Sequence, residues 1–561
     1  MKRRQFLTDV MTDKELPKAI PVEKFQNQKI PDHLELGVGS IAPYSGVWNE
    51  TKLKHLLRRT LFGYSKSDLD FFKTKSMDEA VDILMDIPTS SPTPPINAYN
   101  TPRLIDPNIN AGETWVNGPD DPTFIVERRQ SLYAWNMQQL LKNDRHIQEK
   151  MTIFLHNHFA TESEEIFSPI VAYRHHKLLR DNCLGNFKDM IKKITIDTGM
   201  LYYLNGYVNS KTAPDENYAR ELMELFTLGK SPESQYTEDD VKAAARTLTG
   251  WSINPTDFQT FFSPFKHDTT NKTFSSFYNN TVITGKTGTN GELETDDLIN
   301  MIFTKEDIIA RFIVRKLYRY FVYYVIDTNI ENNVIVPLAN IFKQNWELKP
   351  VVTALLKSEH FYDNNNIGCM IKNPLDAVGN FIKAFNIPMP TDTIQKDYAS
   401  HLTLWSAASS MGMNFGNPPN VSGWSAYYQT PQYYQLWLNS DTLPKRIMYS
   451  VAAMAVGIDY PGGKLQADLL EFAKQFPNPE NPNLLLQNCI DFFYAMDISS
   501  TKKAELKNST LLFGLNEDFY WTNAWNDYIN DPTDASKKNT ANTGIALMLK
   551  YLLDLAENQL I

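Results

Sequence analysis

The sequence has few cysteines and no long apolar run, and both absences exclude classes of protein. Only three cysteines occur in 561 residues. None belongs to a Cys-x-x-Cys pair, which argues against a zinc–thiolate centre, a redox motif or a disulfide scaffold. No apolar segment approaches the roughly 20 residues that span a bilayer, so we do not expect an integral membrane protein. A Gly-rich phosphate loop, a nucleophile elbow and a His-Glu-x-x-His motif are also missing.

Basic residues are fewer than acidic residues. The formal net charge is -10, with 55 Lys and Arg against 65 Asp and Glu. No basic run interleaved with aromatic residues is present, so nucleic acid is not an expected partner. Hydrophobic residues make up 42% of the chain and charged residues 21%, a composition typical of a packed globular protein.

The first residues carry two conflicting signals about location. Arg3 and Arg4, followed by Phe6 and Leu7, resemble a twin-arginine export signal. Such a signal also needs an apolar core of about 7–15 residues, and charged residues interrupt the segment 8–15. We therefore favour a cytoplasmic location, with export to the periplasm as the alternative.

Helical periodicity dominates the chain and predicts an all-α fold, a multi-helix globular bundle. Residues 1–47 are rich in Pro, Lys and Glu and predict an extended N-terminal arm that contributes little to the core. We expect a helical core over 48–440 and a C-terminal helical region packed on it over 441–561. Phe, Thr, Asn and Gly crowd the stretch from about 253 to 290, which predicts a small β-hairpin insertion. Residues 89–123 are dense in Pro, Asn and Gly and predict a long loop.

Capping and terminating residues indicate the ends of two consecutive helices before the insertion. Asp215 is placed to cap the first helix, and Gly229 to end it. Thr237 and Asp240, three residues apart, predict a capping box at the start of the second helix. That helix is expected to run to about Leu248.

A set of motifs follows one order along the chain between about residues 50 and 440. They are His55–Gly63, Phe154–Phe159, Glu216–Gly229, Tyr236–Val241, Arg246–Trp251, His267-Asp268 with Lys272, and Asn417–Trp424. In this order they resemble the bacterial family called domain of unknown function 1800. The resemblance implies no agreed activity. It also implies frequent export and a companion protein of another uncharacterised family, domain of unknown function 1501, which itself resembles sulfatases and phosphatases.

Glu221 and Glu224 are the first candidates for chemistry. Helical geometry places them on one stripe with Asn217. Two carboxylates at this spacing could ligate a divalent metal, or act as a catalytic acid–base pair if they are buried. The alternative, which we favour, is a solvated polar face with Arg220 as a local ion partner.

His156 and His158 are the second candidates, as metal ligands. On a helix the two rings point about 160° apart, so they would not serve one ion. If the segment were extended instead, both rings would share one face. His158 lies on the apolar stripe with Met151 and Phe154, which favours a hydrogen-bonded core histidine.

Three further sites remain. His267 and Asp268 lie together in the loop-rich insertion and are candidate catalytic residues, or an ordinary turn. Arg58 and Arg59 could clamp an anion, although ion pairing with the abundant acids is the interpretation that we favour. The pair His175-His176 is expected at the surface of a helix.

Two hypotheses for function remain. The first is a helical accessory protein that binds a partner enzyme or a polymer through its long loops. The second is a metal-assisted hydrolase with a pocket of His, Glu and Asp side chains. The second hypothesis uses some of six side chains: His156, His158, Glu221, Glu224, His267 and Asp268. Whether these side chains converge in one pocket distinguishes the two hypotheses.

Overall fold

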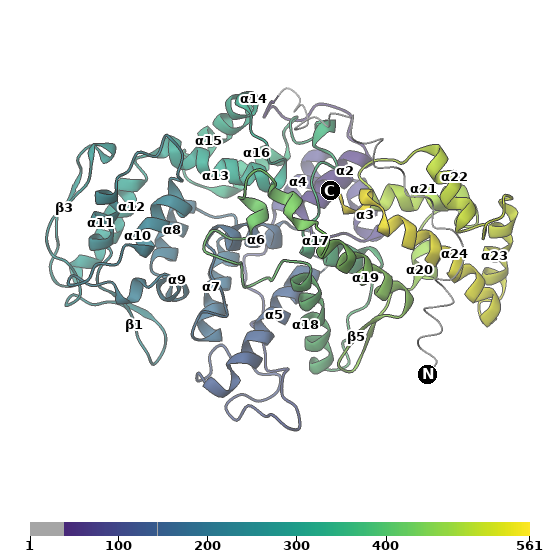
Figure 1. Cartoon of the computed structure of the whole chain (residues 1–561), viewed down its shortest axis with the longest axis horizontal. Helices are drawn as coiled ribbons and strands as arrows, with labels where there is room; N and C mark the ends of the chain where they lie inside the picture. The colour runs from purple at the N-terminus through teal and green to yellow at the C-terminus, as the bar shows by residue number, and fades with distance from the viewer. Residues whose placement is uncertain (1–38, 143) are drawn as a thin grey trace. The chain divides into compact units, whose positions relative to one another are not determined.

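Helices account for most of the residues that the computed structural model describes, which are 39–142 and 144–561 (Figure 1). The predicted arm therefore falls largely outside the described residues, as does the segment with the two conflicting export signals. The described end of that arm runs along the core: Tyr44 N donates to Lys357 O at 2.8 Å, and Glu359 N donates to Ala42 O at 2.8 Å.

The first helices begin at side-chain caps that the sequence supplies. Ser65 and Ser76 each form a capping box. The sequence over 68–85 predicts one helical segment, and the box at Ser76 divides it into two helices. The backbone at Gly63 has a φ of +85°, and a Cβ there would lie 2.4 Å from the Cα of Asn380. Only glycine fits this turn. The helices up to the insertion are α2 (Glu50–Thr60), α3 (Lys66–Lys73), α4 (Met77–Met85), α5 (Ile125–Leu141), α6 (Gln148–His158), α7 (Pro169–Asp181), α8 (Phe187–Thr195) and α9 (Thr198–Tyr203).

The β-hairpin insertion is confirmed and consists of two short antiparallel hairpins. Strands β1 (Trp251–Ile253) and β2 (Thr260–Phe262) form the first, and β3 (Lys272–Thr273) and β4 (Val282–Ile283) form the second. The capping box of Thr237 is confirmed at the start of α11 (Glu238–Thr247). Before it, α10 (Asn217–Glu221) continues as a π-helix over Leu222–Thr227.

The remaining helices are also mostly short. They are α12 (Leu293–Ile302), α13 (Glu306–Phe321), α14 (Thr328–Ile330), α15 (Val336–Phe342), α16 (Leu348–Leu356), α17 (Pro374–Ala384), α18 (Ile394–Ser410), α19 (Thr442–Ala455), α20 (Leu469–Lys474), α21 (Pro482–Phe493), α22 (Ser500–Ser509), α23 (Phe519–Asn530) and α24 (Ala535–Asp554). A third hairpin, β5 (Ile458–Tyr460) with β6 (Gly463–Leu465), was not predicted. Its two strands are too short to give a period-two pattern. Its turn is signalled by Pro461-Gly462-Gly463, with a φ of +102° at Gly462.

The long loop over 89–123 is ordered because it supplies part of the core. Trp115 is fully buried, and its Nε1 donates to Ser131 Oγ of α5 at 3.0 Å. Arg128 of α5 forms a buried ion pair with Asp106 of the loop, at 2.8 Å. These contacts hold the loop against α5. The loop starts beside the place where α5 and α18 pack together.

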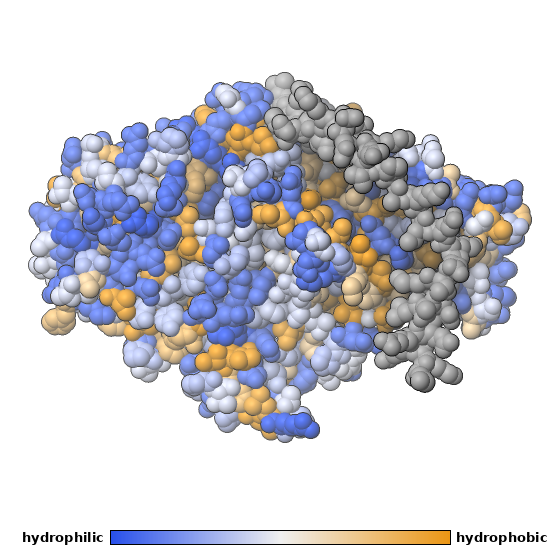
Figure 2. All heavy atoms as spheres, viewed as in Figure 1, coloured by the Kyte–Doolittle hydropathy of each residue, from blue (hydrophilic) through white to orange (hydrophobic). Residues whose placement is uncertain are grey.

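The surface is mixed in polarity. On the face shown in Figure 2, hydrophilic residues predominate over α8 to α12, and apolar patches are more frequent toward the middle. Among the described residues, every helix is too short or too polar to cross a bilayer.

Candidate functional site

Glu221 and Glu224 do not meet a histidine. Glu224 pairs with Lys230 at 2.7 Å, and Arg220 pairs with Glu216 at 3.0 Å and with Glu238 at 2.7 Å. Burial, and after it the charge of Glu224, raises the pKa of the Glu221 carboxyl. The two acids therefore lie on a polar face whose ion pairs are local.

His158 contacts the same π-helix, but through the main chain. Its Nε2 donates to Phe226 O at 3.1 Å, and its Nδ1 accepts from Lys316 Nζ at 2.9 Å. Both ring nitrogens are satisfied, and burial holds the pKa of His158 well below its usual range. Because α6 extends to His158, the alternative of an extended segment is wrong.

His156 points to the other side of α6, as the helical geometry requires, and meets α7. Its ring centroid lies 4.8 Å from that of His176 and 6.5 Å from that of His175. His175 Nδ1 bonds Asp197 Oδ2 at 2.8 Å. Within 39–142 and 144–561, both ring nitrogens of His156 lack a hydrogen-bond partner. Burial, and secondarily His175, lowers the pKa of His156 to about 3.

The expected exposure of His175 and His176 is wrong, since their exposed fractions are 0% and 3%. The reason is that α7 is packed on two sides, by α6 and α9. These three histidines do not make a metal centre as they stand. Within 39–142 and 144–561, no three His, Cys, Asp or Glu side chains are arranged to hold a metal ion.

His267 and Asp268 belong to a buried network that fastens the insertion to α12. His267 Nε2 lies 3.0 Å from Glu294 Oε1, and Lys272 Nζ lies 2.5 Å from Glu294 Oε2. His267, Lys272 and Glu294 are at most 1% exposed. Asp268 pairs with Arg246 at 2.7 Å, and hydrogen bonds from Arg246 and Thr270 lower the pKa of its carboxyl to about 2 against the opposing effect of burial.

Arg58 and Arg59 are both buried, and the expected ion pairing is wrong. Arg58 Nη2 donates to Phe492 O at 3.0 Å and to Tyr494 O at 2.7 Å. Arg59 Nη2 donates to Asn366 O at 3.0 Å, whereas its Nε and Nη1 have no partner. Main-chain carbonyls from distant segments thus replace the acids that we expected. In the described part of the chain, no hydrogen bond or ion pair joins any two of the six side chains named for the hydrolase hypothesis.

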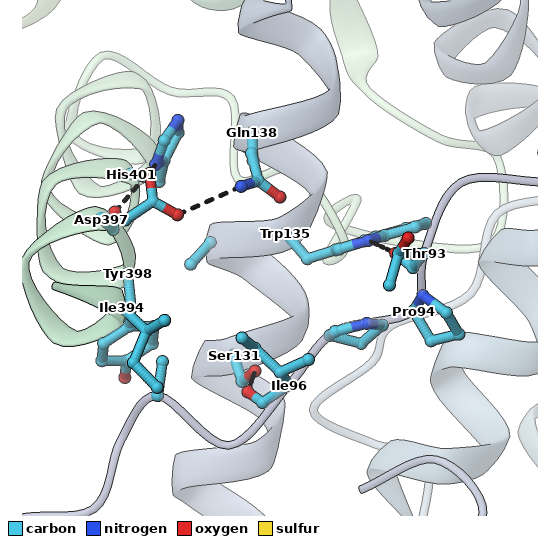
Figure 3. A pocket seen from close by; sticks show the side chains of 13 residues that line it. Thr93, Pro94, Ile96, Ser131, Trp135, Gln138, Ile394, Asp397, Tyr398 and His401 are labelled. Atoms are coloured by element: carbon cyan, nitrogen blue, oxygen red, sulfur yellow. Dashed lines mark hydrogen bonds and ion pairs between the residues drawn. The ribbon is translucent and has the colours of Figure 1, made fainter. Parts of the chain in front are cut away.

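A cleft that was not predicted lies between α5, α18 and the start of the long loop (Figure 3). It has a volume of about 190 Å³. Apolar side chains form most of its walls: Pro94, Pro95, Ile96, Ala98, Ala134, Trp135, Ile394 and Tyr398. Trp135 Nε1 donates to Thr93 O at 2.7 Å, which fixes the indole in the wall.

Asp397, Gln138 and His401 form the polar end of this cleft (Figure 3). Gln138 Nε2 donates to Asp397 Oδ2 at 3.1 Å, and His401 Nδ1 donates to the main-chain carbonyl of Asp397 at 2.8 Å. The same His401 Nδ1 lies 3.2 Å from Asp397 Oδ1. The Asp397 side chain is 33% exposed, and among the described residues no Lys or Arg pairs with it. The Ser131 hydroxyl, which also lines the cleft, already donates to Ile96 O at 2.9 Å and accepts from Trp115 Nε1.

Sequence reasoning missed this cleft for a definable reason. Its walls come from residues 93–98, α5 and α18, so that Gln138 and Asp397 are 259 positions apart. The available signal was weak: Asp397 and His401 are spaced i, i+4 on one helix, and the adjacent loop is unusually long.

Comparison with known proteins gives a family and little else. A family model described as "Protein of unknown function (DUF1800)" matches residues 55–557. The match therefore extends well beyond residue 440, where the motifs become less distinct. Neither the curated proteins nor the solved structures contain a match.

Proposed function

The chain belongs to the DUF1800 family of proteins of unknown function, and we propose that it is a binding protein whose α5–α18 cleft receives a cationic group the size of one side chain. The observation that carries the proposal is the Asp397 carboxylate. It lies at the polar end of a hollow with apolar walls and has no Lys or Arg partner among the described residues. A carboxylate in this setting gains most from an incoming cation.

The dimensions of the cleft support a small ligand group. Pockets for drug-sized ligands usually measure roughly 300–1,000 Å³, and this cleft measures about 190 Å³. It suits a single ring or an alkyl stem, with Trp135 and Tyr398 as flat apolar surfaces and Asp397 for a guanidinium, amidinium or ammonium head. The net charge of -10 favours the approach of a basic partner.

The metal-assisted hydrolase is supported less well. It needs several of the side chains of His156, His158, Glu221, Glu224, His267 and Asp268 in one pocket. His158, His267 and Asp268 are instead engaged in hydrogen bonds that hold the fold together. Glu224 is paired with Lys230. A binding role needs only the Asp397 carboxylate, which is partly exposed and has no Lys or Arg partner among the described residues.

For a physiological partner we propose a companion protein of the domain of unknown function 1501 family, as the family resemblance implies. A Lys or Arg side chain of that protein would insert into the cleft. Co-purification of the two proteins should then be lost when Asp397 is replaced by Asn. If the two proteins associate equally well with D397N, another surface of this chain is the interface.

Benzamidine is a suitable probe for the cleft because it combines one aromatic ring with an amidinium. Isothermal titration calorimetry of the full chain should give one site for benzamidine and no binding of neutral benzamide. D397N should weaken the affinity at least about tenfold, which corresponds to about 1.4 kcal/mol. Asp239 is an exposed acid on α11, and D239N serves as the matched control with unchanged affinity. Equal binding of benzamidine and benzamide, or by D397N and the unmodified chain, would refute the proposal.

A further inference from the structure

A small cavity with two buried cations lies between α17, α19 and the end of α24. Its polar lining consists of Lys372, Asn380, Arg446, Ser450, Asn558 and Gln559. Lys372 is 4% exposed and Arg446 is 3% exposed. In the described part of the chain, no Asp or Glu lines this cavity.

Neutral groups take up most of the donors of these two cations. Lys372 Nζ donates to Asn558 O at 2.6 Å and to Asn558 Oδ1 at 3.3 Å. Arg446 Nη1 donates to Lys372 O at 2.9 Å and to Gln559 Oε1 at 3.3 Å. Arg446 Nε is buried and has no hydrogen-bond partner among the described residues. The Nε–H of the Arg446 guanidinium is therefore a charged donor without an acceptor in the described structure, on a side chain that lines the cavity.

The nearby charges do not compensate for the two cations. Arg58 raises the local positive charge next to Lys372, and Asp376 is the negative charge that acts on both Lys372 and Arg446. Asp376 already forms a buried ion pair with Lys150. Lys372 and Arg446 thus share one carboxylate with Lys150, in a place where an uncompensated charge is costly.

We propose that this cavity binds one small monovalent anion, held by Arg446 and Lys372. The volume of about 20 Å³ sets the size. A space of roughly 10–15 Å³ is enough for one water molecule, so a halide ion or one carboxylate oxygen fits, and a tetrahedral oxyanion does not. A halide ion and a carboxylate oxygen would bind in the same way. Each carries negative charge and accepts hydrogen bonds from the Arg446 Nε and the Lys372 ammonium.

The first test is the melting temperature of the full chain at constant ionic strength. Sodium chloride and sodium formate are each titrated against sodium methanesulfonate, whose anion is too large for the cavity. Chloride should raise the melting temperature saturably, by about 2 °C or more. An effect of chloride alone identifies a halide site, and an equal effect of formate identifies a carboxylate site. No anion-specific rise at all would overturn the proposal.

Variants then place the effect in the cavity. Lys372→Met should abolish the anion dependence, whereas Lys538→Met on α24, outside this cavity, should preserve it. If Lys372→Met does not fold, a bromide-soaked crystal of the unmodified protein decides by anomalous scattering. A bromide peak beside Arg446 Nε supports the site, and a cavity without bromide refutes it. The same anion dependence in both variants would also refute it.

Discussion

Replacing Glu294 by Ala is the most demanding test of the assignment of His267 to a structural network. Glu294 is fully buried and accepts hydrogen bonds from His267 Nε2 at 3.0 Å, Lys272 Nζ at 2.5 Å and Lys286 N at 2.5 Å. Its removal leaves the buried Lys272 ammonium without a counter-ion. Breaking a buried ion pair in this way costs on the order of 3–5 kcal/mol, a large part of the roughly 5–15 kcal/mol that stabilises a folded domain.

Urea denaturation followed by circular dichroism gives the loss in the free energy of unfolding. Hydrogen exchange locates it, because the amides of residues 249–295 should lose protection before the rest of the chain. Asp239→Ala is the control: Asp239 is 89% exposed and pairs with Lys242 at 3.2 Å, so its removal should cost less than about 1 kcal/mol.

A double variant separates the charge from the packing. Glu294→Leu combined with Lys272→Met removes both charges and should recover much of the stability that Glu294→Ala loses. If Glu294→Ala costs no more than Asp239→Ala, the network does not fasten the insertion. His267 would then again be a candidate for catalysis.

Three further predictions concern buried groups. Burial, and after it the charge of Arg319, lowers the pKa of Lys316 to about 7 from 10.5. Between pH 7 and 10.5 the unfolded chain therefore binds more protons than the folded chain, and the free energy of unfolding should rise by up to about 1.4 kcal/mol per pH unit. Lys316→Met should remove this rise in urea titrations. His156→Phe should change stability by less than about 1 kcal/mol, because neither ring nitrogen has a hydrogen-bond partner among the described residues. His175→Phe should cost more, about 1–3 kcal/mol, because it removes one of the two hydrogen bonds that the Asp197 carboxylate oxygen accepts, the other coming from Met200 N. Equal losses in chemical denaturation would contradict this. Gly423→Ala should lower the melting temperature measurably, since φ is +89° and the new Cβ would lie 2.3 Å from Asn157 Oδ1; an unchanged melting temperature would show that the turn can relax.

Local signals in the sequence were enough to predict many of the elements. The capping box of Thr237 and Asp240 is present in the structure, and the β-prone residues near Val282 form a strand. These features depend on residues only a few positions apart, so that local rules decide them. The division of the segment over 68–85 into two helices was missed, although Ser76 carries the signal for it.

The candidate sites depended on contacts that no local pattern reveals. His267 was identified, but its partner Glu294 lies 27 positions away and turns a catalytic candidate into a buried structural group. His175 was expected at the surface because one helix alone does not show what packs on its second side. For the same reason the cleft at Asp397 was invisible, since it exists only where α5, α18 and the long loop come together.

The position of bound benzamidine in a crystal tests the central claim most directly. The amidinium should lie within hydrogen-bonding distance of the Asp397 carboxylate, with the ring between Trp135 and Ile394 in the α5–α18 cleft. The D397N variant, soaked in parallel, should show an empty cleft. Benzamidine bound at another surface, or a cleft that stays empty at concentrations that saturate the calorimetric titration, would contradict the proposed function.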